Sequence, residues 1–208
     1  MLVEHCYYAM VLFVQFCFYL VFHLVFKAFF RAEITGIENI PVKPFILASN
    51  HTAKIDPFLL CQLPFSAAKQ LMPIYFLTSE YYYRKWYLKP ILKLLGCYPV
   101  IKRAWTLEEF LSSSLKKLKD GKIIVFFPEG KIIRNNEKDK PRPGIGYLAK
   151  KSGKSILPLH IKWTGVNIFR SNKMTLSFGK LVTFQGESDQ LNSYEKEAER
   201  IMKIIYSL

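Results

Sequence analysis

An uninterrupted apolar segment near the N-terminus constrains this chain more than any other feature of its sequence. The 22 residues from His5 to Phe26 include no Asp, Glu, Lys or Arg. As a helix they would span roughly 33 Å, which is enough to cross the hydrocarbon core of a bilayer. The five Phe and three Tyr of the segment suit the interface between lipid and water. A helix that crosses the membrane and a helix or hairpin that lies in one leaflet therefore both remain open.

The residues around this segment argue against a cleavable signal peptide. Glu4 precedes it without any positive charge, and no small-x-small cleavage site follows it. A buried helix of a soluble protein is the plainer alternative, but such a helix rarely stays uncharged on all its faces for six turns. Lys27 and Arg31 come directly after the segment, and nearly all of the remaining charge follows them. If the segment crosses the membrane, the positive-inside rule places the basic remainder in the cytoplasm, so we expect it on the cytoplasmic face of the cell (inner) membrane.

The overall composition limits the remaining possibilities. The 208 residues suit one domain with an appendage, and the 50% share of hydrophobic residues excludes a disordered chain. The formal net charge of +14 predicts an anionic partner: nucleic acid, a membrane surface or a phosphorylated small molecule. The four cysteines show no C-x-x-C spacing, so we expect a reducing compartment and no structural zinc site.

After residue 31 the sequence alternates between short apolar runs and helical patterns, which is typical of an α/β fold. We divide the chain into a membrane-associating segment, 1–31, and a catalytic domain, 32–208. The predicted strands are 44–48, 72–77, 97–101, 122–127 and 156–161, with a strand or hairpin at 174–184. The predicted helices are 84–95, 106–120, 145–151 and 192–208.

A histidine and an aspartate lie five residues apart after the first of these strands. On a regular helix His51 and Asp56 would point about 140° apart, so they could not meet. They can meet if the strand ends at Ala48, the chain turns, and Asp56 caps a helix that has Pro57 at its first position. His51 could then act as a general base whose tautomer the carboxylate fixes, with a hydroxyl of the substrate as the nucleophile. An ordinary helix cap before Pro57 would explain Asp56 equally well.

Two further strand ends carry charged residues. Glu129, Gly130 and Lys131 follow the most hydrophobic strand, with Arg134 just beyond, and the strand at 97–101 ends in Lys102 and Arg103. Each could be a turn with solvated charges. Together with His51, however, they predict a base beside a phosphate-binding pocket, because loops at strand ends build the sites of α/β folds.

Four motifs in chain order resemble those of the glycerolipid acyltransferases typified by 1-acylglycerol-3-phosphate acyltransferase. They are Asn-His-x4-Asp, Gly-Cys-Tyr-Pro-Val-x-Lys-Arg, Phe-Pro-Glu-Gly and Ile-Leu-Pro-Leu, and the resemblance covers residues 32–165. It implies a single mixed, largely parallel sheet covered by helices. It also implies transfer of a fatty acyl group from acyl-CoA or acyl-carrier protein to the sn-2 hydroxyl of lysophosphatidic acid. Glycerol 3-phosphate or another lysophospholipid is the alternative acceptor.

The resemblance also assigns roles to residues. His51 corresponds to the general base and Asp56 to its orienting partner, with no metal and no cofactor, and we expect a backbone N–H near the His51 turn to hold the oxyanion. The implied substrate-binding residues are Asn50, Lys102, Arg103, Glu129, Gly130, Lys131, Arg134 and Pro158. The expected partners are a lysophospholipid, an acyl thioester, which could be carried by acyl-carrier protein, and membrane lipids, but not nucleic acid.

Two departures from the family pattern bear on the acceptor headgroup. The second motif usually has its Arg six residues after the Gly, where this chain has Lys102. The third usually continues Thr-Arg-Ser, where this chain has Lys131 followed by two Ile, so its cation could be Lys131 or Arg134. A rival hypothesis is a non-enzymatic, membrane-tethered basic protein that binds anionic lipid or nucleic acid. The aromatic and basic stretch 81–89 fits either partner, and we favour lipid.

Overall fold

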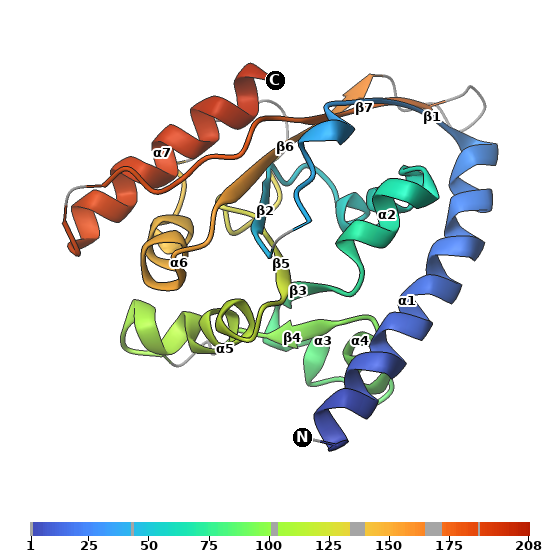
Figure 1. Ribbon diagram of the computed structural model, residues 1–208, viewed down its shortest axis with the longest axis horizontal. Helices are drawn as coiled ribbons and strands as arrows, with labels where there is room; N and C mark the ends of the chain where they lie inside the picture. The colour runs from blue at the N-terminus through green and yellow to red at the C-terminus, as the bar shows by residue number, and fades with distance from the viewer. Residues whose placement is uncertain (1, 43, 101–103, 134–139, 165–171, 187) are drawn as a thin grey trace.

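The computed structural model describes residues 2–42, 44–100, 104–133, 140–164, 172–186 and 188–208. Within these ranges seven strands form one sheet in the order β1-β7-β6-β2-β5-β3-β4 (Figure 1). All neighbouring strands are parallel except β6 and β7, which are antiparallel. The predicted mixed, largely parallel sheet is therefore confirmed. The strands are β1 (Phe30–Thr35), β2 (Ile46–Ser49), β3 (Ile74–Thr78), β4 (Cys97–Pro99), β5 (Ile123–Phe126), β6 (Ile156–Thr164) and β7 (Asn172–Phe178).

Helices cover both faces of this sheet. The helices α5, α6 and α7 lie on one side of the central strands, and α1 and α2 lie on the other (Figure 1). The α-helices are α1 (Leu2–Phe29), α2 (Phe65–Leu71), α3 (Glu80–Tyr83), α4 (Lys89–Leu94), α5 (Leu107–Lys119), α6 (Gly144–Ser152) and α7 (Leu191–Ser207). Two 3-10 helices, η1 (Ile37–Asn39) and η2 (Asp56–Gln62), complete the described elements.

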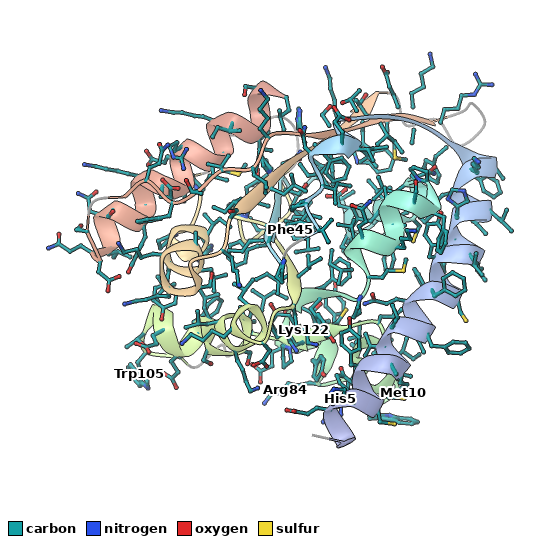
Figure 2. The ribbon with its side chains drawn as sticks, viewed as in Figure 1. His5, Met10, Phe45, Arg84, Trp105 and Lys122 are labelled. Atoms are coloured by element: carbon teal, nitrogen blue, oxygen red, sulfur yellow. The ribbon has the colours of Figure 1, made fainter. Side chains whose placement is uncertain are left out.

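The central strands are buried on both faces, as expected for parallel strands between two helical layers. On β2, Ile46 and Ala48 pack toward α5, α6 and α7, whereas Leu47 packs toward α2 and η2. Phe45, which precedes β2, is 1% exposed and lies at the centre of the molecule (Figure 2). The apolar runs in the sequence therefore correspond to strands with two buried faces.

Most predicted elements are confirmed, and the differences have local causes. The helix predicted over 84–95 begins only at Lys89, where Pro90 occupies the first turn and cannot extend a helix from the preceding residues. The strand β1 was not predicted, because it is not a continuous apolar run: Arg31 and Glu33 lie on its exposed face. The predicted boundary at residue 31 falls within β1, so α1 continues directly into the sheet.

The apolar N-terminal segment is one continuous helix, not a hairpin, and it runs along the side of the molecule from α4 to β1 (Figure 1). Val11 and Phe26 are buried against the domain. Four polar side chains on the same face bind backbone groups of other elements. This polar stripe consists of Tyr7, bonded to the Lys93 carbonyl, Gln15, bonded to both backbone groups of Ile74, Tyr19, bonded to the Leu63 carbonyl, and His23, bonded to the Cys61 carbonyl.

The opposite face of α1 is apolar and open to solvent. Phe13, Val21, Leu24 and Phe29 are each more than half exposed. By length and composition alone, α1 is the one helix in the described part of the chain that could cross a membrane. Its inner face, however, is attached to the domain from Tyr7 to Phe26, so α1 lies alongside the domain rather than standing away from it.

Candidate active site

His51 and Asp56 meet in the turn that follows β2. The His51 Nδ1 atom lies 3.0 Å from Asp56 Oδ2, and the His51 side chain is 18% exposed whereas that of Asp56 is fully buried. The same Asp56 oxygen accepts the backbone N–H groups of Thr52 at 2.6 Å and Ala53 at 2.8 Å. With Nδ1–H donating to the carboxylate, Nε2 is the nitrogen of His51 that can take up a proton.

The geometry of Asp56 differs from the predicted helix cap. Asp56 is the first residue of η2, and its carboxylate binds the amides of residues that precede it rather than those of the helix. It therefore closes the turn around His51. The N–H groups of His51, Thr52 and Ala53 all donate to carboxylates, so they are not available to an oxyanion. An oxyanion-binding N–H elsewhere near this turn stays a prediction.

The main chain of His51 is held on both sides by the segment after β5. Its N–H donates to Glu129 Oε2 at 2.6 Å, and its carbonyl accepts the Ile133 N–H at 2.8 Å. The Phe127 ring stacks on the imidazole, with centroids 4.2 Å apart and planes 21° apart. The strand ends of β2 and β5 thus come together as the sequence predicts, because β2 and β5 are parallel neighbours.

Glu129 is 3% exposed, and both of its carboxylate oxygens bind groups of the protein. Oε2 accepts the His51 amide, and Oε1 accepts the hydroxyl of Tyr206 from α7 at 2.5 Å. Burial raises the pKa of Glu129, while the hydrogen bonds from Tyr206 and His51 act in the opposite direction. The structure thus places Glu129 against the His51 backbone, and its contact with substrate stays a prediction.

Two other predicted substrate-binding residues lie inside the sheet. Asn50 is 1% exposed, and its side chain exchanges two hydrogen bonds of 2.8 Å with the backbone of Ile161. Asn50 therefore fixes the end of β2 to β6, and its contact with substrate stays a prediction. Pro158 is buried in β6 opposite Ala48. It packs closely against Gly179, because a Cβ added at Gly179 would lie 2.8 Å from the Cγ of Pro158.

The predicted phosphate-binding cations are only partly described. Lys102, Arg103 and Arg134 lie outside the described residues, whereas Lys131 is exposed in the loop that follows Gly130. Gly130 has a φ of 67°, which favours glycine.

A further cation, Arg142, lies against this glycine and was not predicted. A Cβ at Gly130 would be 2.8 Å from both Cδ and Nε of the Arg142 side chain. The backbone N–H of Arg142 donates to the Pro128 carbonyl at 2.8 Å. The only sequence signal was a basic residue between two prolines, before the Gly that opens α6. Arg142 brings a planar, always protonated guanidinium next to the turn that holds His51, which suits recognition of a phosphate.

The arrangement can carry out general-base chemistry on a hydroxyl that approaches His51 Nε2. The buried carboxylate of Asp56 fixes the ring and would stabilise the imidazolium that forms. A cation beside the same turn could hold an anionic group of the substrate.

Comparison with known proteins gives two lines of similarity. A family model described as Acyltransferase matches residues 31–162, more than half of the chain. A probable 1-acyl-sn-glycerol-3-phosphate acyltransferase from Mycoplasma pneumoniae is 25% identical over 132 residues, which are 63% of this chain and 49% of the relative. A 1-acyl-sn-glycerol-3-phosphate acyltransferase from Borreliella burgdorferi is 26% identical over 179 residues, 83% of this chain and 67% of the relative. The matched part thus spans about half of the first relative.

The fold is also shared with a solved structure. The crystal structure of the 1-acyl-sn-glycerophosphate (LPA) acyltransferase from Thermotoga maritima matches with a TM-score of 0.68. The match covers 93% of this chain and 79% of that one at 18% sequence identity, so it bears on the fold alone.

Proposed function

Because the chain belongs to the acyltransferase family, we propose that it transfers a fatty acyl group from an acyl thioester to the sn-2 hydroxyl of 1-acylglycerol 3-phosphate, giving phosphatidic acid. The observation that carries the proposal is the 3.0 Å contact between His51 Nδ1 and Asp56 Oδ2 beside the Glu129 turn. The names of the two curated relatives support lysophosphatidic acid as the acceptor. Glycerol 3-phosphate and other lysophospholipids are the alternative acceptors.

The reaction needs one base and no covalent enzyme intermediate. His51 Nε2 removes the proton from the acceptor hydroxyl as its oxygen attacks the thioester carbonyl, and Asp56 stabilises the resulting imidazolium. The tetrahedral intermediate then collapses, the C–S bond breaks, and the imidazolium returns the proton to the leaving thiolate of coenzyme A or acyl-carrier protein. The acceptor supplies the nucleophile, so neither a metal nor a cofactor takes part in these steps.

Arg142 is proposed to hold the acceptor phosphate together with Lys131, with Lys102, Arg103 and Arg134 retained as predictions. Replacing Arg142 with Ala should raise the KM for lysophosphatidic acid about tenfold, because a charge-assisted hydrogen bond to phosphate is lost. The rate with monoacylglycerol, which lacks the phosphate, should change little. Steady-state kinetics with both acceptors test this, with Lys150→Ala on the exposed side of α6 as the control. Equal losses with both acceptors would contradict the role in phosphate binding.

A groove of about 600 Å³ between α1 and the segment that follows η2 is proposed to receive the acyl chain. Its walls are mainly apolar and include Phe16, Leu20 and Phe65. Gln62, which lines the groove, is the last residue of η2, and Asp56, the partner of His51, is the first. Seven residues of 3-10 helix span roughly 14 Å. The distance along η2 from Asp56 to the groove is therefore within the reach of a long acyl chain.

Filling this groove should change the preferred chain length of the donor. We expect Leu20→Trp to reduce kcat/KM for long acyl thioesters several-fold while sparing short ones, because the larger side chain shortens the available space. Leu24→Trp is the matched control, since Leu24 lies on the same helix, is 70% exposed and does not line the groove. Rates with donors of increasing chain length measure the effect. The same profile in both variants would argue against the groove as the acyl site.

Membrane binding is proposed through the outer face of α1 and the adjoining α3–α4 segment, with the basic domain on the cytoplasmic side. Trp86 and Tyr87, which precede α4, are 84% and 50% exposed, and Arg84 and Lys85 lie beside them. Because α4 packs on α1, these aromatic and basic side chains extend the exposed apolar face of the helix. Such a combination suits an interface with anionic lipid.

The proposed function is tested by an acceptor panel on the purified protein in detergent. Lysophosphatidic acid, glycerol 3-phosphate and neutral or zwitterionic lysolipids are each supplied with acyl-CoA or with acyl-carrier protein, and thiol release is measured. The proposal predicts the highest kcat/KM with lysophosphatidic acid. Preference for glycerol 3-phosphate or another lysolipid would select an alternative acceptor. Salt-sensitive oligonucleotide binding without any acyl transfer would favour the non-enzymatic rival.

A further inference from the structure

Tyr206, close to the end of α7, is linked to His51 through one side chain. Its hydroxyl donates to Glu129 Oε1 at 2.5 Å, and Glu129 Oε2 accepts the His51 N–H at 2.6 Å. Tyr206 lies outside residues 31–162, the part of the chain that the family model matches. The motifs therefore account for His51 and Glu129 but not for the group that holds the second oxygen of Glu129.

The end of α7 is fixed where this contact forms. Ile201 and Ile205 of the same helix are fully buried among residues of the sheet, α5 and α6. Leu208 packs on Gly179, where a Cβ would lie 3.0 Å from Leu208 Cδ1. The His160 ring of β6 also meets the Tyr206 ring edge to face, with centroids 5.7 Å apart. The backbone at Tyr206 is thus fixed by buried residues on both sides of it in the helix, while Tyr206 itself is 42% exposed.

From this chain of contacts we infer that Tyr206 is a positioning residue for acyl transfer, because its hydroxyl orients the Glu129 carboxylate that fixes the main chain of His51. The inference rests on the proposed role of His51 as the general base. It adds the C-terminal helix to the parts of the molecule that build the active site. Tyr206 itself touches neither of the reacting groups.

The charges around Glu129 give this contact a measurable consequence. His51 and Asp56 face Glu129 from the turn after β2 and from η2, Tyr206 faces it from α7, and His160 of β6 packs on Tyr206. Burial raises the pKa of Glu129, and the Tyr206 hydrogen bond lowers it because it stabilises the carboxylate. Removing the hydroxyl should therefore raise the pKa of Glu129, so that the carboxylate is lost at a higher pH than in the wild type.

Tyr206→Phe removes the hydroxyl and keeps the ring. We expect kcat to fall about tenfold with both KM values within a factor of two, and the acid limb of the rate profile to move to higher pH. Tyr194→Phe is the matched control, because it removes a hydroxyl from the same helix that donates to Asp189 instead. In a Glu129→Gln background, Tyr206→Phe should cause no further loss. Equal effects of the two tyrosine substitutions, or additive losses, would overturn the inference.

A second readout does not depend on catalysis. In protein labelled with 15N-histidine, the His51 amide signal should titrate with Glu129, and Tyr206→Phe should raise the midpoint of that titration while Tyr194→Phe leaves it unchanged. An unchanged midpoint in Tyr206→Phe overturns the inference even if the wild type transfers acyl groups. A wild type that is inactive with every acceptor refutes the proposed function, while the amide titration still decides whether Tyr206 acts on Glu129.

Discussion

Replacing His51 with Ala should reduce acyl transfer about a thousandfold while leaving the protein folded. The imidazole is the group we propose to remove the proton from the acceptor hydroxyl, and general-base catalysis contributes about 10²- to 10⁴-fold to such reactions. Binding of the substrates depends on other residues, so their KM values should change little. Thiol release from acyl-CoA in the presence of lysophosphatidic acid measures the effect.

The control for this substitution is His5→Ala. His5 is exposed near the start of α1, away from the turn after β2, and its replacement removes the same side chain without touching the proposed dyad. Near-UV circular dichroism of both variants checks that the packing around Asp56 is kept. A His51→Ala rate equal to that of His5→Ala would show that the base has been assigned wrongly.

Deleting residues 1–29 should cause the protein to unfold or aggregate, and should not release a folded soluble domain. The deletion removes the apolar contacts of Val11, Tyr19 and Phe26 with the domain. Burial of each large apolar side chain contributes about 1.5–3 kcal/mol to the free energy of unfolding. It also leaves the backbone partners of the polar stripe of α1 without their hydrogen bonds. The loss is comparable with the whole free energy of unfolding of an ordinary domain, about 5–15 kcal/mol. Size-exclusion chromatography and thermal unfolding of the truncated protein measure it.

Two single substitutions separate the two faces of α1. Gln15→Leu should lower the melting temperature by several degrees, because it leaves the Ile74 N–H and carbonyl unpaired in a buried place. Leu24→Gln on the outer face should instead weaken binding to anionic vesicles and leave the melting temperature unchanged. A truncated protein that is monodisperse and unfolds cooperatively would refute the docked role of α1.

The sequence was sufficient for the central strands of the sheet, because they are continuous apolar runs, but not for the edge strand β1. Thr106 caps α5 as its spacing predicts, since its hydroxyl accepts the Glu109 N–H at 3.1 Å. The docking of α1 was not predictable, because a helix that is apolar all round gives no sign of which face is buried. The polar stripe marks the buried face of α1. In the sequence alone, however, its four residues suit the membrane interface equally well.

The site was predictable where neighbouring residues act together, and not where distant ones do. His51 and Asp56 lie five residues apart, and the turn that joins them was expected. Tyr206 lies 77 residues after Glu129 and comes from a helix without any recognised motif. Arg142 likewise lies against Gly130 because its backbone N–H donates to the Pro128 carbonyl. Contacts of this kind depend on the packing of whole elements, which local spacing does not encode.

The most direct measurement is the product formed by the purified full chain from acyl-CoA and lysophosphatidic acid, identified by mass spectrometry. If His51 activates the sn-2 hydroxyl for attack on the thioester, phosphatidic acid and free thiol should appear in equal amounts, and no acylated protein should accumulate. Absence of any new ester with every acceptor of the panel, from protein shown by circular dichroism to be folded, would contradict the proposed function.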